Sequence, residues 1–227
     1  MTLILFDIDG TLTSTGEADM RCFAAAFQRL FGFPVPSFDW HYYTQFSDSG
    51  VMGEILEGHR GTFASPEEIE LFEAALVQEL EREYAANPDA FQAVPGAKTL
   101  IEAVSASPNH GFSLATGCLR GSALFKLAKI GIDARDFPGG FSNDTPLRSE
   151  IAQNAIARAD EQTDDIVYVG DGVWDVRVAK TLGIRYLGVT WEADVERLKA
   201  EGATAWVHDF RDLDVFWTAL GAASVPE

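Results

Sequence analysis

Four short apolar runs constrain the fold of this chain more than any other feature. They lie at residues 3–6, 112–115, 166–169 and 186–189. Continuous apolar runs of this length are typical of strands that are buried on both faces, as in parallel sheets covered by helices. Between the runs, apolar residues recur at helical spacing in segments 98–105, 122–130, 150–160 and 174–182. Gly131 and Gly183 directly follow two of these segments as helix stops. The alternation predicts an α/β fold, a doubly wound parallel-sheet (Rossmann-like) core.

The stretch between residues 15 and 93 breaks this alternation. It contains helical patterns at 18–31 and 66–84 but no convincing buried strand. The flanking segments 13–16 and 93–96 have the composition of turns. We therefore expect an inserted α-helical domain at 15–93, and a core domain formed by residues 1–14 and 94–227. Within the core, residues 207–220 are expected to add a strand end and a helix, and residues 222–227 to form a frayed tail.

The composition excludes several classes of function. Seventeen Lys and Arg residues stand against 35 Asp and Glu residues, which gives a formal net charge of -18. Such a surface repels nucleic-acid phosphates and anionic lipid, so we expect no nucleic-acid and no membrane partner. No apolar run approaches the roughly 20 residues of a membrane span. Cys22 and Cys118 lack the spacing of a disulfide framework or a zinc site, which favours a cytoplasmic protein.

Polar residues follow three of the apolar runs directly. In chain order they are Asp7 and Asp9, then Thr116 and Gly117, then Asp171 and Asp175. Ligands of open parallel sheets bind beyond the carboxyl ends of the strands, so these residues should meet at one edge. Four converging carboxylates would repel one another unless a hard cation binds between them, and an all-oxygen ligand set suits Mg²⁺. The sequence therefore predicts Mg²⁺ as cofactor, and this ion would also supply the positive charge that a phosphate needs on an acidic protein.

The same segments resemble motifs of the haloacid dehalogenase-like (HAD) hydrolase superfamily. The residues concerned are Asp-Ile-Asp-Gly-Thr at 7–11, Thr-Gly at 116–117 and Gly-Asp-Gly-Val-Trp-Asp at 170–175, in the order of the family. The resemblance covers the core from residue 1 to about 207. The insertion resembles the helical cap of phosphatases of the phosphoglycolate phosphatase type. It implies a phosphoric monoester hydrolase acting on a small phosphorylated metabolite, as a monomer or a homodimer.

The resemblance also implies roles for the motif residues. Asp7 would attack phosphorus and form an aspartyl-phosphate. Asp9 would protonate the leaving oxygen and then activate the water that hydrolyses the intermediate. Thr116 and Gly117 would bind the phosphoryl oxygens. The metal ligands would be Asp7, the backbone carbonyl of Asp9, Asp171 and, supporting them, Asp175.

The chain departs from the family pattern at the third motif, where the family most often places a lysine that neutralises the phosphoryl group. No lysine lies between Ile130 and Val178. Arg148 is the best occupant, because its planar fork can bind two phosphate oxygens and so serve both binding and catalysis. Lys126, inside the helix of the second motif, is the alternative.

Several alternatives stay open at this level. A phosphomutase would share the nucleophile, and a non-catalytic metal-binding protein would share the acids, although Asp7 and Asp9 together favour catalysis. A dehalogenase would give Asp9 no role. Cys118 and Arg120 could line the phosphate site or begin a helix, and Trp174 is expected to pack against the sheet. Segment 44–50 is either a substrate-facing loop or a helix connector.

Overall fold

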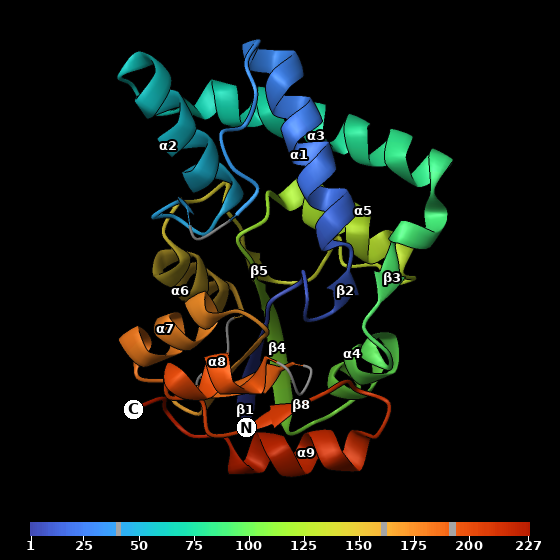
Figure 1. Cartoon of the computed structure of the whole chain (residues 1–227). Helices are drawn as coiled ribbons and strands as arrows, with labels where there is room; N and C mark the ends of the chain where they lie inside the picture. The colour runs from blue at the N-terminus through green and yellow to red at the C-terminus, as the bar shows by residue number, and fades with distance from the viewer. Residues whose placement is uncertain (40–41, 160–162, 191–193) are drawn as a thin grey trace.

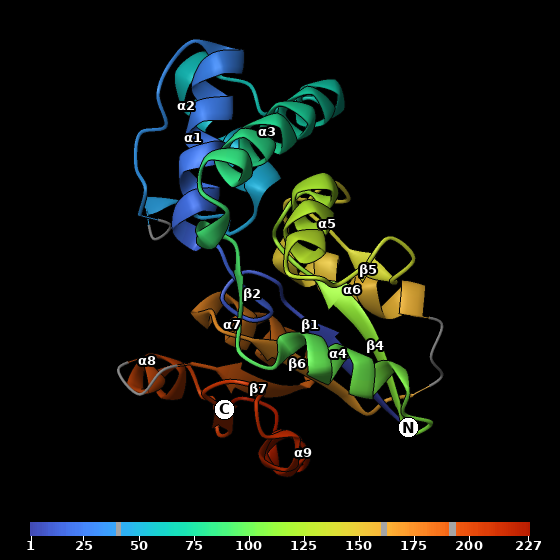
Figure 2. The same cartoon turned by 90° about the vertical axis from the view of Figure 1, so that its right-hand side faces the viewer.

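The computed structural model describes residues 1–39, 42–159, 163–190 and 194–227. In these residues, six parallel strands form the main sheet in the order β5-β4-β1-β6-β7-β8. Strands β5, β4, β1 and β8 are labelled in Figure 1, and β6 and β7 in Figure 2. The strands are β1 (Thr2–Phe6), β4 (His110–Ala115), β5 (Gly139–Gly140), β6 (Ile166–Gly170), β7 (Arg185–Val189) and β8 (Trp206–Val207). All four predicted runs are strands of this sheet, and the predicted α/β fold class is confirmed.

Helices cover both faces of the sheet. They are α4 (Ala97–Ser105), α5 (Arg120–Lys129), α6 (Arg148–Ala159), α7 (Val173–Leu182), α8 (Val195–Ala200) and α9 (Leu213–Ala222). Because side chains alternate along a strand, Ile4 and Phe6 of β1 pack in the cluster with α4, α5 and α9. Leu3 and Leu5 pack in the opposite cluster, with α6, α7 and α8. The two layers bury residues 3–6 of β1 on both faces.

The helical insertion lies beyond the carboxyl end of the sheet (Figure 2). It comprises α1 (Gly16–Phe31), α2 (Asp48–Arg60), α3 (Pro66–Ala86) and the 3-10 turn η2 (Pro88–Ala90). These helices have their own apolar cluster, in which Phe23 and Phe27 each pack edge to face on Phe72. The chain leaves and re-enters the core through an antiparallel pair, β2 (Thr13–Ser14) and β3 (Gln92–Ala93). We propose on this basis that the insertion acts as a cap with the boundaries expected from the sequence, 15–93.

Two features differ from the sequence-based expectations. Helix α2 was not expected as a helix, and its first turn occupies the second half of segment 44–50. The prediction of a frayed tail is wrong, because Tyr186 N donates to Ser224 O at 3.0 Å and Ala223 is buried. Strand β8 pairs only with Gly188 and Val189 of β7, which leaves Tyr186 free to bind the tail. Among the described helices, none combines the length and the apolar character that crossing a membrane requires.

Candidate functional site

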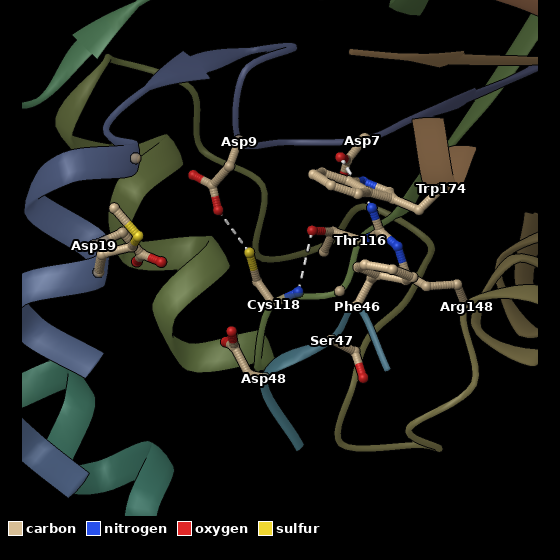
Figure 3. A pocket seen from close by; sticks show the side chains of 13 residues that line it. Asp7, Asp9, Asp19, Phe46, Ser47, Asp48, Thr116, Cys118, Arg148 and Trp174 are labelled. Atoms are coloured by element: carbon tan, nitrogen blue, oxygen red, sulfur yellow. Dashed lines mark hydrogen bonds and ion pairs between the residues drawn. The ribbon is translucent and has the colours of Figure 1, made fainter. Parts of the chain in front are cut away.

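The register of the central strands brings the predicted residues to one edge. Phe6 lies opposite Leu114 of β4 and Val169 of β6, so the residues that follow leave the sheet at the same level. A cavity of about 100 Å³ opens there between core and insertion (Figure 3). The core contributes Asp7, Asp9, Thr116, Gly117, Cys118, Arg148 and Trp174 to its lining. The insertion contributes Gly16, Asp19, Met20, Phe46, Ser47 and Asp48.

Three carboxylates converge beside this cavity. Asp7, Asp171 and Asp175 each offer an oxygen, and the three oxygens lie within 4.8 Å of one another. Burial, together with repulsion from Asp175 and Asp7, raises the pKa of Asp171 well above its usual range. Burial and the charge of Asp7 raise the pKa of Asp175 to about 7. Asp7 Oδ1 is buried and has no hydrogen-bond partner among the described residues. This donor set, with its excess negative charge, fits a hard divalent cation.

Arg148, the first residue of α6, lies against two of these carboxylates. Its Nη2 donates to Asp175 Oδ1 at 2.8 Å and to Asp7 Oδ2 at 3.4 Å. The side chain is only 9% exposed, and its guanidinium carbon lies 6.0 Å from the centre of the Trp174 ring. Arg148 therefore places a cation next to Asp7, where a third-motif lysine was expected from the resemblance. Lys126 does not contact Asp7; it contacts Asp9.

The side chain of Asp9 is not part of the three-carboxylate group. Its Oδ1 accepts hydrogen bonds from Thr13 and Thr15 at 2.9 Å each. Its Oδ2 accepts from Cys118 Sγ at 2.8 Å and from Lys126 Nζ at 2.5 Å. Burial raises the pKa of Asp9, but Lys126 and the hydrogen bonds outweigh it and hold the pKa below its usual value. In Figure 3 the carboxylate points toward Cys118 and away from Asp7. Three carboxylate side chains converge, where four were expected.

Thr116 lies at the end of β4 and lines the cavity. The residue is almost fully buried, and its Oγ1 accepts a hydrogen bond from Cys118 N at 3.2 Å. The hydroxyl therefore keeps its own hydrogen available for a ligand oxygen. Arg120 begins α5 and lies outside the cavity lining, with its guanidinium donating to Arg135 O at 3.1 Å.

Two motif glycines are required by close approach. Gly10 has a φ of 78°, and a Cβ there would lie 2.1 Å from an oxygen of Asp171. A Cβ at Gly117 would lie 2.6 Å from Phe46 O and 2.8 Å from Arg148 Nη1. Glycine at position 117 thus lets the insertion and the arginine approach the strand end together.

Residues of the insertion complete the cavity. Asp48 Oδ2 accepts from Leu119 N at 2.9 Å, and burial together with the charge of Asp19 raises the pKa of Asp48 to about 7. Phe46 stacks on Trp174 with ring centres 5.4 Å apart. Segment 44–50 leads into α2 and also contributes to the cavity lining. Ser47 caps α2 by accepting from Gly50 N, and it also lines the cavity.

A family model described as haloacid dehalogenase-like hydrolase matches residues 1–183. The chain belongs to the haloacid dehalogenase-like hydrolases. The predicted family membership is thereby confirmed, and so is the prediction of a hydrolytic enzyme.

Individual relatives of this HAD hydrolase agree with the assignment. It is 26% identical over 221 residues to glycerol-1-phosphate phosphohydrolase 2 of Saccharomyces cerevisiae. The matched region covers 93% of this chain and 83% of the yeast protein. A hydrolase from Pseudomonas syringae has the same fold, with a TM-score of 0.72, 22% identity, and coverage of 96% of this chain and 98% of that one. CbbY from Rhodobacter sphaeroides, solved in complex with phosphate, gives a TM-score of 0.69 at 20% identity, with 93% and 95% coverage.

Sequence reasoning about this HAD hydrolase found only part of the insertion side of the site, because it raised segment 44–50 as a substrate-facing loop but did not single out Asp19. Asp19 and Asp48 lie in or at the start of helices, where an acid in the first turn is common and carries no functional signal. Phe46 was not singled out, and Trp174 was expected only to pack, whereas it lines the cavity. The stretch Ser47-Asp48-Ser49, a run of small polar residues in an otherwise helical insertion, was the one signal available.

Proposed function

We propose that this HAD hydrolase is a Mg²⁺-dependent phosphatase that hydrolyses a small phosphate monoester through an aspartyl-phosphate on Asp7. The observation that carries the proposal is the buried Asp7 Oδ1. It has no hydrogen-bond partner among the described residues, while Arg148 holds the other oxygen of the same carboxylate. A carboxylate that is fixed on one side and free on the other suits attack on an electrophile brought into the cavity.

Mg²⁺ would be held by Asp7 and Asp171, with Asp175 supporting them and the backbone carbonyl of Asp9 as a further ligand. When bound, it would supply positive charge to the phosphoryl oxygens. The chain's own residues would supply the rest of the electrostatic stabilisation, because Arg148 and Thr116 border the same cavity. Arg148 would bind phosphoryl oxygens through its free N–H groups, and Thr116 through its hydroxyl, beside Gly117.

The reaction would proceed in two displacements. An oxygen of Asp7 forms a bond to phosphorus while the ester P–O bond breaks, and the departing alcohol oxygen takes a proton from Asp9. Because, against the effect of burial, Lys126 holds the pKa of Asp9 below its usual value, Asp9 first takes up that proton from solvent as the substrate binds. A water molecule then attacks the phosphorus of the aspartyl-phosphate and gives a proton to Asp9. Inorganic phosphate and a restored Asp7 result.

The cavity favours a small, uncharged alcohol as leaving group. The insertion contributes two carboxyl groups, Asp19 and Asp48, to the lining of the cavity. None of the described residues that the insertion contributes to the lining is a cation. Carboxyl groups accept hydrogen bonds from hydroxyl groups, and they offer no positive charge to a second phosphate. The yeast relative carries glycerol 1-phosphate in its name, which supports a polyol phosphate as substrate class. We therefore propose hydrolysis of a monophosphate rather than a phosphomutase reaction. On sequence grounds we also propose a cytoplasmic enzyme.

Substitution of Asp7 by Asn tests the proposal. With Mg²⁺ present, release of inorganic phosphate is measured from glycerol 1-phosphate, sugar phosphates, phosphoglycolate and nucleotides. Asp7→Asn should lose turnover by roughly 10⁴-fold or more, as removal of a catalytic nucleophile does in other enzymes. Asp133→Asn is the matched control, because Asp133 is exposed and pairs with Arg135.

The possible outcomes separate the alternatives. Unchanged phosphate release by Asp7→Asn would disprove the nucleophile. An isomerised sugar phosphate without free phosphate would indicate the mutase. If the wild type hydrolyses none of these esters, the hypothesis of a non-catalytic metal-binding protein would be favoured.

A further inference from the structure

A buried lysine next to the cavity has no part in the proposed phosphate chemistry. Lys126 of α5 is 0% exposed, and it is not among the residues that line the cavity. Burying an ammonium group is costly unless its charge is paired and its donors are satisfied. An apolar residue at this helix position would avoid that cost. The charge of Lys126 therefore calls for an explanation beyond packing.

The partners of Lys126 come from two parts of the molecule. Its Nζ donates to Asp9 Oδ2 at 2.5 Å and to Asp19 Oδ1 at 2.9 Å, and it lies 3.3 Å from Cys118 Sγ. Asp9 follows β1 of the core, whereas Asp19 belongs to α1 of the insertion. One ammonium group thus connects the proposed acid–base residue with the helical insertion.

Lys126 is the strongest of the groups that hold Asp9. The others are the hydroxyls of Thr13 and Thr15 and the thiol of Cys118, all of which are neutral donors. All four hydrogen bonds are charge-assisted, because Asp9 is ionised, but only Lys126 adds the attraction of an opposite charge, which is strong where water is excluded. Loss of the ammonium would also leave Asp9 facing the unneutralised carboxylate of Asp19. The orientation of Asp9 should therefore depend on Lys126 more than on any other described donor.

We propose that Lys126 is a positioning residue that orients Asp9 for proton transfer, and that Asp19 makes this orientation depend on the placement of α1. The proposal rests on the phosphatase function proposed above. It assigns Lys126 an effect on the protonation of the leaving group and none on the attack by Asp7. It also gives the insertion a way to act on catalysis without touching the phosphoryl group.

The test compares two substrates that differ in their need for an acid. Release of an alkyl alcohol from glycerol 1-phosphate needs a proton from Asp9, whereas p-nitrophenolate leaves without one. In single-turnover experiments with Mg²⁺, Lys126→Met should slow alcohol release by roughly 10- to 100-fold, a part of what a general acid contributes. The p-nitrophenol burst should change by less than about threefold, and KM should change little. Lys129→Met, on the exposed side of the same helix, is the matched control.

A double-mutant cycle decides whether Lys126 acts through Asp9. In an Asp9→Asn background, Lys126→Met should cause no further loss, because the group that it orients no longer exchanges a proton. A second full loss in that background would overturn the proposal. So would an equal loss of the alkyl and the p-nitrophenyl reactions by a folded Lys126→Met protein.

Asp19→Asn keeps the proposal testable if Lys126→Met does not fold. This substitution is isosteric and leaves Lys126 in place. Because Asp19 also lines the cavity, the test uses ethyl phosphate, whose alcohol has no second hydroxyl for Asp19 to bind, and compares single-turnover rates at saturating substrate. We expect a several-fold slower release of ethanol than in the wild type and a smaller change in the p-nitrophenol burst. Absence of that difference would overturn the role given to the insertion. If the wild type released neither alcohol nor p-nitrophenol, the proposed function itself would fail, and this outcome is distinct from all the others.

Discussion

Two buried clusters of carboxylates, each with one cation, border the same cavity and differ in origin. The first, the nucleophile cluster, consists of Asp7, Asp171, Asp175 and Arg148. The second, the bridging cluster, consists of Asp9, Asp19, Cys118 and Lys126. All residues of the nucleophile cluster belong to the core, whereas Asp19 brings the insertion into the bridging cluster.

The two clusters also differ in how far they are neutralised. The nucleophile cluster has three carboxylates for one guanidinium, and Asp7 Oδ1 lacks a partner among the described residues. The bridging cluster has two carboxylates for one ammonium, and both oxygens of Asp9 accept hydrogen bonds. Because an unpaired buried charge is costly, the excess negative charge of the first cluster favours binding of a further cation. The second is complete in itself, which suits positioning.

The largest effect should come from the cation of the nucleophile cluster. Arg148→Ala removes the group that faces both Asp7 and the cavity, so kcat should fall by roughly 10²- to 10³-fold, as for other lost transition-state donors. Arg148→Lys should recover only part of the lost kcat, because an ammonium group lacks the planar fork of a guanidinium. Steady-state phosphate release measures the effect, with Arg120→Ala as control outside the cavity. Wild-type turnover in Arg148→Ala would mean that another cation stabilises the phosphoryl group.

Mg²⁺ should raise the free energy of unfolding through the nucleophile cluster and not through the bridging cluster. Mg²⁺ should stabilise the wild type, because it neutralises three mutually repelling carboxylates, and at 100 times its Kd it should add about 2.7 kcal/mol to the free energy of unfolding. Asp171→Asn should lose most of this gain, whereas Asp19→Asn should keep it. Urea unfolding with EDTA or with Mg²⁺ measures both. An equal gain in Asp171→Asn would place the ion elsewhere.

A smaller effect concerns the negative charge around the bridging cluster. Burial and Asp19 raise the pKa of Asp48 from 3.8 to about 7. A raised folded-state pKa means that the folded protein holds the proton more tightly. The stabilising contribution of that proton is therefore complete below about pH 3.8 and is lost as the pH rises through about 7.

Asp48→Asn cannot ionise, but it keeps an oxygen to accept from Leu119 N. In EDTA, its free energy of unfolding should fall less steeply between pH 4 and pH 7 than that of the wild type, by at most about 1.4 kcal/mol per pH unit. Urea unfolding across this range measures the slope. Identical slopes would show that Asp48 does not titrate there.

The strands and most helices could be predicted because their signals are local. Each of the four apolar runs lies within a strand, and Gly131 and Gly183 both adopt positive φ after the helices they were expected to stop. Helix α2 could not be predicted, because its glycines disfavour a helix. A Cβ at Gly53 would lie 1.9 Å from the ring of Phe63, so tertiary packing, and not helix propensity, requires glycine there.

The site is predictable from the sequence only in part, and the bridging cluster belongs to the part that is not. By itself the sequence determined that Asp7, Thr116 and Asp171 meet, because parallel strands in register end at one edge of the sheet. Only the tertiary structure decided that Arg148, and not the alternative Lys126, lies beside Asp7, and that Lys126 joins Asp9 to Asp19. The lysine and Asp19 are 107 positions apart in sequence, and their contact depends on how the insertion packs over α5. Such a contact leaves no periodicity or spacing in the sequence, because it forms between surfaces that only the folded chain brings together.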